Sequence, residues 1–296
     1  MFNRDFMDYH KDRFDDYSLL IFKNEKLVAL LPANKVKDVV FSHAGLSYGG
    51  LLLHPDMKFR DVLDVFKNML QFLFDKGINA IHFKVLPFIY NHHASDELLY
   101  LLFITKAELV KRESLSVLNL SIQPKRSKNR IEGYRRGLKN NLIVKELDSF
   151  NAFWDIILKA NLKSKHGAIP VHSLEEITRL KHKFPNNIRQ FNVYKDGLIV
   201  AVTTIFESDR VAHSQYISGN RDKNRLGSLD FLHTHLIDNV FQKKDYFDFG
   251  SSNENNGLNI NEGLQYWKEG FGARTITQDF YKVCTTNFRL LDDVML

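Results

Sequence analysis

The chain has 296 residues, 44% of them hydrophobic and 26% charged, which is typical of a folded, globular protein of one or two domains. Its net charge of +6 suits polyanionic partners, although a solvated basic surface is the commoner explanation. A single cysteine, Cys284, excludes an intrachain disulfide and a multi-cysteine zinc site. Apolar runs too short to span a bilayer, and a charged N-terminus, lead us to expect a cytoplasmic protein without membrane insertion.

Two segments far apart in the chain are alike. Residues 21–31 are IFKNEKLVALL and residues 193–203 are VYKDGLIVAVT, each with two apolar-rich runs around a short charged turn. Such a turn between β-rich runs predicts a hairpin. Further strand-like sequence follows each hairpin, over 36–53 in the first half and 208–216 in the second.

The next element strengthens this internal repeat. Residues 64–83 (DVFKNMLQFLFDKGINAIHF) align without a gap with residues 230–249 (DFLHTHLIDNVFQKKDYFDF). In both, apolar residues first recur at helical spacing and then alternate as in a strand. We therefore predict an α/β (α+β) chain of two similar domains, each a mixed, mostly antiparallel sheet flanked by helices.

The apolar pattern breaks at the basic stretch SIQPKRSKNRIEGYRRGLKNN. This break places a first domain at 1–120, a basic connecting helix at 121–148 and a second domain at 149–296. We expect the donor site in the second domain, because only there does a glycine, Gly227, precede the repeated helix. A glycine ahead of a helix lets backbone N–H groups approach a phosphate. A turn or an N-terminal cap at Ser228 is the alternative interpretation.

The second half resembles the GNAT superfamily of acyl-CoA-dependent N-acyltransferases. The matching loop is Asn224-Arg225-Leu226-Gly227-Ser228-Leu229, which keeps only the first glycine of the family's pyrophosphate-binding pattern. The whole chain is similar to the tandem, FemAB-like branch, through FDFGSSNENNGLNINEGLQYWKEGFGAR at 247–274. The resemblance implies two GNAT-like domains, the first degenerate. It also implies acetyl-CoA or another acyl-CoA as donor, with no metal. The implied donor-binding residues are Asn224, Arg225, Gly227, Ser228 and Leu229.

Acyl transfer to an amine needs a base, a stabilised oxyanion and a proton for the leaving group. In the strand VAHSQYIS, His213 is a candidate base, because its reference pKa lies near neutral. The alternative role of His213 is local hydrogen bonding. Tyr266 lies where the superfamily often presents a general acid, and core packing is the alternative. Lys268 matches the active-site lysine of the FemAB-type signature, with a surface ion pair as the alternative. The substrate-binding candidates are Tyr216, Asp248 and Ser251.

The densest run of positive charge lies in the connecting stretch, from Lys125 to Lys139. Four interpretations stay open: a solvated helix face, a contact for the adenosine 3′-phosphate, a tRNA docking surface and an anionic acceptor site. The loop at 163–173 could shape an acceptor pocket. Three functions are compatible with the sequence: an N-acyltransferase acting on an amine such as an amino sugar or amino acid derivative, an aminoacyl-tRNA-dependent transferase with tRNA as partner, or a non-catalytic RNA- or protein-binding fold. Acceptor identity and oligomeric state are left open.

Overall fold

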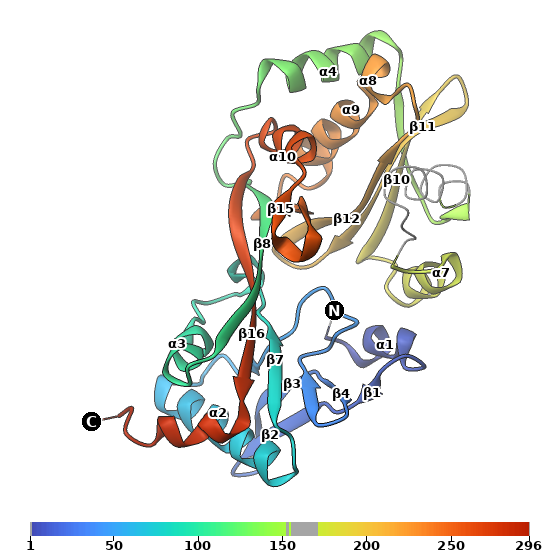
Figure 1. Ribbon diagram of the computed structural model, residues 1–296. Coiled ribbons are helices and arrows are strands. Elements are labelled where there is room, and N and C mark those ends of the chain that lie inside the picture. The colour runs from blue at the N-terminus through green and yellow to red at the C-terminus, as the bar shows by residue number, and fades with distance from the viewer. Residues whose placement is uncertain (1, 152–153, 155–170, 296) are drawn as a thin grey trace. The chain divides into compact units, whose positions relative to one another are not determined.

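The computed structural model describes residues 2–151, 154 and 171–295 (Figure 1). The chain divides into two compact units, the first comprising 1–113 and 277–296 and the second 114–276. Two strands, β8 (Glu108–Asn119) and β16 (Arg274–Cys284), contribute residues to both units. The boundaries at 120 and 148 therefore stay a prediction of domain organisation, to which the structure adds that the C-terminal segment belongs with the first unit.

The first unit contains a mixed sheet and a small second sheet. In the mixed sheet the strands follow the order β1-β4-β5-β7-β16, and β5 and β7 are parallel neighbours. The bounds are β1 Asp15–Asp16, β4 Asn34–Val36, β5 Val39–Phe41 and β7 Ala80–Lys84. The small sheet is β2-β3-β6, with bounds Leu19–Lys23, Lys26–Leu31 and Leu52–Leu53. The helices are α1 (Arg4–Met7), α2 (Phe59–Asp75) and α3 (Glu97–Ile104).

The second unit is built on a mostly antiparallel sheet in the order β8-β13-β12-β11-β10-β9. Its one parallel pair among the described strands is β12–β13. The bounds are β9 Ile143–Leu147, β10 Ile188–Lys195, β11 Leu198–Glu207, β12 Val211–Gly219 and β13 Tyr246–Ser251. A two-stranded ribbon, β14 (Asn253–Glu254) with β15 (Asn259–Ile260), follows β13. Both units thus carry the predicted mixed, mostly antiparallel sheet with flanking helices.

The helices of the second unit begin where short polar side chains cap them. Ser127 caps α4 (Lys128–Lys139), Ser173 forms a capping box with Glu176 on α7 (Leu174–Lys183), and Asn261 caps α10 (Glu262–Glu269). These side chains accept bonds from first-turn N–H groups that no carbonyl can reach. The remaining helices are α8 (Lys223–Leu226) and α9 (Ser228–His235), the latter continuing as a π-helical turn over Leu236–Val240.

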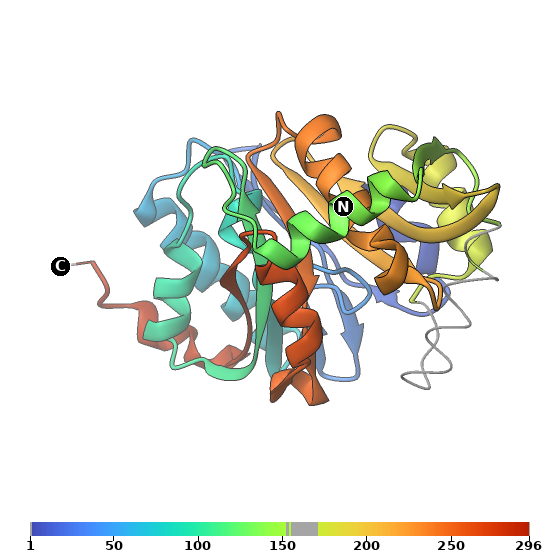
Figure 2. The same ribbon diagram turned by 90° about the horizontal axis from the view of Figure 1, so that it is seen from above.

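Helices α4 and α9 lie side by side in the second unit, green and orange in Figure 2. Two glycines of α4 make the contact possible. A Cβ on Gly133 would lie 1.7 Å from Asp230 Oδ2, and one on Gly137 would lie 2.5 Å from Phe231 Cβ. Side chains at these positions would hold the helices apart, so the G-x-x-x-G spacing of the basic stretch is a packing feature.

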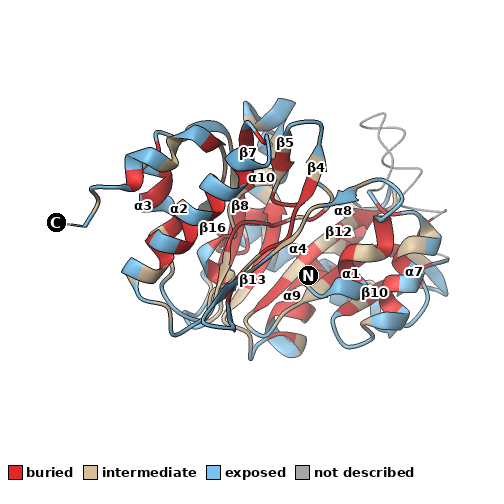
Figure 3. Ribbon diagram, turned by 90° about the horizontal axis from the view of Figure 1, so that it is seen from below, coloured by how far each residue is buried: buried red, intermediate tan, exposed pale blue. Residues whose placement is uncertain are grey.

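Each unit has its own apolar core, red in Figure 3. In the first, α2 buries Phe66, Leu70 and Leu73. In the second, Phe241, Phe247 and Phe271 are at most 1% exposed. At roughly 25 cal/mol per Å² of apolar area, aromatic side chains of this size are the main stabilising contacts. None of the helices described is long and apolar enough to cross a membrane.

The repeated segments form equivalent structures in the two units. Both predicted hairpins exist, and both turn residues of each, Asn24-Glu25 and Asp196-Gly197, have positive φ as a type I′ turn requires. Segment 64–83 forms most of α2 and β7, and 230–249 forms most of α9, the π-helical turn and β13. The parallel register also matches, because Phe41 pairs with His82 in the first unit as His213 pairs with Asp248 in the second.

Candidate active site

The parallel strands of the second unit separate soon after they meet. β12 and β13 pair over Val211–His213 and Tyr246–Asp248, after which β12 runs on to Gly219 without β13 beside it. β13 stays attached to β8 on its other side, where Ser251 pairs with Leu115. A gap opened in this way leaves backbone groups of both strands without a partner strand, so they can bind a ligand.

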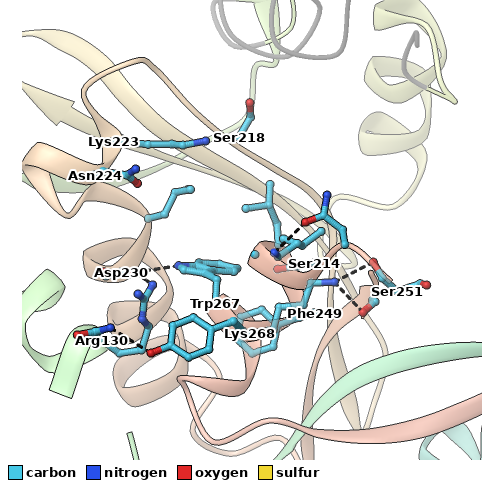
Figure 4. A pocket seen from close by; sticks show the side chains of 18 of the residues that line it. Arg130, Ser214, Ser218, Lys223, Asn224, Asp230, Phe249, Ser251, Trp267 and Lys268 are labelled. Carbon is cyan, nitrogen blue, oxygen red and sulfur yellow. Dashed lines mark hydrogen bonds and ion pairs between the residues drawn. The ribbon is translucent and has the colours of Figure 1, made fainter. Parts of the chain in front are cut away.

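A cavity of about 880 Å³ lies at this separation, within the size range of small-molecule sites. It is lined by β12, the end of β13, one face of α4, the start of α8 and α9, and α10 (Figure 4). All of its lining residues belong to the second unit. In Figure 4, Lys223 and Asn224 lie at one end, and Lys268 and Ser251 at the other.

His213 and Asp248 stand where the two strands part. His213 Nδ1 donates to Asp248 Oδ2 at 2.8 Å, and Asp248 is fully buried. The other carboxylate oxygen, Oδ1, accepts from the Gly250 N–H at 2.7 Å. Because the carboxylate holds the proton on Nδ1, the lone pair of the neutral imidazole is on Nε2. His213 lines the cavity, and Asp248 bonds to it from outside the lining, so the carboxylate orients the imidazole that faces the cavity.

Lys268 is a buried cation at the same end of the cavity. It is 1% exposed, and Nζ donates to the carbonyls of Gly250 (2.9 Å) and Ser251 (2.8 Å), the last residues of β13. Burial lowers the pKa of Lys268 to about 8, and the field of Asp248 acts in the opposite direction. Lys268 therefore fixes the end of β13 and places a titratable positive charge at the point of strand separation.

A second polar cluster crosses three helices. Asp230 Oδ1 accepts from Arg130 Nη1 (2.5 Å) and from Trp267 Nε1 (2.8 Å), which joins α9 to α4 and α10. Burial raises the pKa of Asp230, against the opposing effect of Arg130. Arg130 Nε is buried without a hydrogen-bond partner in the part of the chain that is described. All three side chains line the cavity, and we did not anticipate this cluster from the sequence.

Strand β12 carries a bulge at the cavity. The register between β11 and β12 shifts so that Tyr216 pairs with Thr204 and Ser214 with Ile205, which leaves Gln215 between them as the extra residue. Gln215 lines the cavity, and its Oε1 is buried without a partner within the described residues. A buried acceptor of this kind costs about 1–3 kcal/mol unless a ligand N–H bonds to it. The bulge thus presents an acceptor to the cavity.

The loop expected to hold a phosphate packs closely against α4. Gly227 has φ of +67°, and a Cβ there would lie 2.1 Å from the carbonyl oxygen of Gly133. Ser228 is fully buried and does not cap α9. The glycine is therefore required for close packing of the loop against α4. Arg225 is turned to solvent and pairs with Asp222.

Six of the predicted site residues line this one cavity. They are His213, Asn224, Leu229, Ser251, Tyr266 and Lys268. Tyr266 is largely exposed, and its hydroxyl accepts from Asn129 at 3.2 Å.

The other five predicted residues do not line the cavity: Arg225, Gly227, Ser228, Tyr216 and Asp248. Tyr216 is buried, and its hydroxyl bonds to His172 Nδ1 at 2.6 Å. The loop at 163–173 falls outside the described residues up to 170. Within the described ranges, no three His, Cys, Asp or Glu side chains are grouped to hold a metal.

Comparison with known proteins identifies the second unit. Residues 125–268 match the family model for an acetyltransferase (GNAT) domain. That range contains the cavity in its entirety. No curated protein matches the sequence.

Three solved structures share the fold over most of the chain. FemX superposes with a TM-score of 0.70 at 8% identity, covering 98% of this chain and 93% of its own. The C-terminal domain of a lysylphosphatidylglycerol synthetase from Agrobacterium fabrum gives 0.61 at 13% identity, covering 90% and 83%. A tandem GNAT protein from the clavulanic acid biosynthesis pathway gives 0.50 at 11% identity, covering 90% and 82%.

Identities this low establish the fold alone, whereas the domain match establishes the superfamily of the unit that contains the cavity. The chain is thus an acyltransferase with a GNAT domain at residues 125–268 and a tandem, FemAB-like fold.

Proposed function

We propose that the protein is an N-acyltransferase that transfers an acyl group from an acyl-CoA, most simply acetyl-CoA, to an amine. The acceptor we propose is a small amine such as an amino sugar or an amino acid derivative. The observation that carries this proposal is the His213–Asp248 pair beside Lys268 at the separation of β12 and β13. A base with its orienting carboxylate and a buried cation are the groups that acyl transfer to an amine needs.

The cavity fits a long donor with an anionic end. Its volume of about 880 Å³ exceeds what a small amine alone would fill. Arg136 and Lys223 contribute positive charge to its lining, and the ion pair of Asp230 with Arg130 is internally neutralised. The buried Gln215 Oε1 would accept an N–H, such as that of an amide in the donor arm. An acyl-CoA would supply its acyl group as a thioester, whose carbonyl carbon is electrophilic.

His213 has the role of general base in this proposal. An ammonium acceptor must lose a proton before or during attack, and the Nε2 lone pair receives it. Asp248 keeps the ring in the required tautomer and stabilises the imidazolium that results. Asp248 acts through His213, so it is a positioning residue rather than a catalytic one.

Lys268 stabilises negative charge. Its ammonium is held by two carbonyls in a dry site, so it needs little reorganisation when charge develops on the acyl oxygen or the leaving group. Tyr266 on α10 can return a proton to the leaving group from the cavity wall.

The second candidate is transfer from aminoacyl-tRNA, as in FemAB-type enzymes. The observation in its favour is the exposed positive charge of α4 outside the cavity, at Arg135 and Lys139. Nucleic acid binding through such a surface would weaken steeply with salt. We propose acyl-CoA first because the positive charge continues into the cavity at Arg136 and Lys223.

A thiol-release assay tests the proposal. Purified protein with acetyl-CoA and a panel of amino sugars and amino acids should release free CoA, with an acetylated amine identified by mass spectrometry. His213→Gln should lower kcat by roughly 10²- to 10⁴-fold, the usual contribution of a general base. His182→Gln is the matched control, because His182 is exposed on α7 and lies outside the cavity. Transfer from aminoacyl-tRNA without any acetyl-CoA turnover would replace the proposal with the second candidate.

A further inference from the structure

We infer that helix α4, rather than the loop before α9, forms the phosphate subsite of the donor cavity. Specifically, Arg136 of α4 and Lys223 of α8 bind the diphosphate of the acyl-CoA. This inference rests on the proposed acyl-CoA donor and specifies which side chains recognise it. It concerns residues that no part of the donor-loop pattern includes.

The loop is already used by the protein itself. Three of its N–H groups bond within the chain, those of Lys223, Leu226 and Gly227, to the carbonyls of Asn220, Asp222 and Lys223. On its other side Gly227 is in contact with the backbone of Gly133. A phosphate therefore finds neither room on the Cβ side of Gly227 nor those three donors.

The start of α9 is also occupied by an anion of the protein. Asp230 lies in the first turn, where a carboxylate complements the helix dipole. It is held there by Arg130 and Trp267, and the absence of a side chain on Gly133 gives it room. The Asp230 carboxylate therefore already complements the dipole of α9, and a phosphate at this helix end would have to compete with it.

Positive charge lines the cavity from two helices, α4 and α8, which pack on each other. Arg136 of α4 lines the cavity, and within residues 2–151, 154 and 171–295 it forms no ion pair. Its field reaches Asp230, because it lowers the pKa of that carboxyl against the effect of burial. Lys223 lines the cavity from α8. A guanidinium and an ammonium on two helices in contact suit two adjacent phosphates, and the guanidinium can bond bidentately.

Neighbouring α4 residues show that the arrangement is specific. The cavity is lined by three α4 residues, Asn129, Arg130 and Arg136. Two glycines of the same helix, Gly133 and Gly137, contact α9. Arg135 has the same charge as Arg136 and is likewise exposed, but it lies outside the cavity lining. It therefore provides a matched control that changes net charge equally.

Calorimetric binding needs no knowledge of the acceptor. We would titrate CoA, 3′-dephospho-CoA and pantetheine into the full chain and into Arg136→Gln, Lys223→Gln and Arg135→Gln. We expect Arg136→Gln and Lys223→Gln each to raise the Kd for CoA about five- to tenfold, and Arg135→Gln to change it less than about twofold. The same penalty should appear with 3′-dephospho-CoA and vanish with pantetheine, which lacks the diphosphate.

Each contrary result has its own meaning. Equal effects of Arg135→Gln and Arg136→Gln would overturn the subsite, because they would reflect net charge alone. A penalty that persists with pantetheine, or that vanishes with 3′-dephospho-CoA, would overturn the assignment to the diphosphate. If the unmodified protein binds no CoA, the proposed donor fails, which is distinguishable from a donor bound normally by all three variants.

Discussion

Both units contain a short pair of parallel strands in the same register, β5–β7 in the first and β12–β13 in the second, and the cavity described above lies where the second pair separates. In the first unit Phe41 and His82 occupy the paired positions, with their rings stacked 4.9 Å apart. In the second unit the equivalent residues are His213 and Asp248, which form a buried, oriented hydrogen bond.

The segments after the two pairs differ more than the pairs themselves. In the first unit the chain after β5 returns to β7: Lys84 N donates to Ser42 Oγ (2.8 Å), and Gly49 N donates to the Lys84 carbonyl (2.9 Å). Lys84 Nζ donates to the Leu46 carbonyl in the same segment. These bonds close the edge of β7 that the second unit leaves open at β13. One fold therefore supports either a packed junction or a ligand site, and the segment after the strand decides which.

The largest expected effect on kcat comes from placing the Phe and His of the first unit's strand pair at positions 213 and 248 of the second unit. The double variant His213→Phe/Asp248→His should lose roughly 10²- to 10⁴-fold in kcat, because it has neither the base nor its orienting carboxylate. Its stability to urea should stay near that of the parent, since the first unit shows that this pair stacks well at these positions. Turnover near the parental level would break the comparison between the two pairs.

The single variant His213→Phe serves as its control. It leaves the Asp248 carboxylate buried without the imidazole, so we expect a loss of about 1–3 kcal/mol in the free energy of unfolding. Recovery of that stability in the double variant would show that the pair, and not either residue alone, fits the junction.

Gly227→Ala tests the close contact between Gly227 and the carbonyl of Gly133 on α4, in a loop for which the first unit has no equivalent glycine. We expect it to lower the free energy of unfolding by about 2–4 kcal/mol, because a positive φ and a clash with the Gly133 carbonyl add together. Gly197→Ala is the matched control. Gly197 also has a positive φ, but nothing lies within 4 Å of its Cβ position, so we expect only about 1 kcal/mol. Equal losses in urea unfolding would contradict the packing role of Gly227.

Sequence patterns were sufficient for the repeated scaffold, since hairpins, helices and strands follow from turn residues and apolar periodicity. His213, chosen from its strand, and Tyr266 and Lys268, chosen through the family resemblance, all line one cavity in the structure. Two features depend on tertiary contact and left weaker signals. Asp230 is only the first residue of the repeated segment 230–249 in the sequence, and its place against Gly133 of α4 follows from helix packing. The role of Gly227 could not be inferred, because its partner, Gly133, is distant in the sequence.

Two lysines, half-buried Lys84 in the first unit and buried Lys268 in the second, offer a finer test of the same comparison. Lys84 Nζ donates to two backbone carbonyls in the segment after β5, and Lys268 Nζ donates to two at the end of β13. Of the two lysines, only Lys268 lines the cavity. Lys268→Met should lower kcat by roughly 10²-fold, as expected for the loss of one electrostatic donor. Lys84→Met should leave kcat unchanged within about twofold. A similar loss of kcat in both variants would mean that the lysines act on folding rather than on transfer.

The smallest expected effect is on the pH dependence of kcat, which shows in which protonation state Lys268 is active. Burial lowers the pKa of Lys268 to about 8. If Lys268 acts as a cation, kcat should fall as pH rises through about 8, because the side chain loses its charge there. Lys268→Arg should move that fall to higher pH, because a guanidinium stays charged. A rate that rises through pH 8 would instead make Lys268 a base.

The free energy of unfolding should change with pH in the opposite direction to kcat, which separates the effect of Lys268 on stability from its effect on turnover. Burial also lowers the pKa of Lys84 to about 8, so for both lysines the unfolded chain holds more protons than the folded one between about pH 8 and the ordinary lysine pKa of 10.5. Each lysine therefore adds stability as pH rises across this window, and each Met variant should flatten that rise by a similar amount. The stability profiles of Lys84→Met and Lys268→Met should thus resemble each other, while only Lys268→Met alters the pH dependence of turnover.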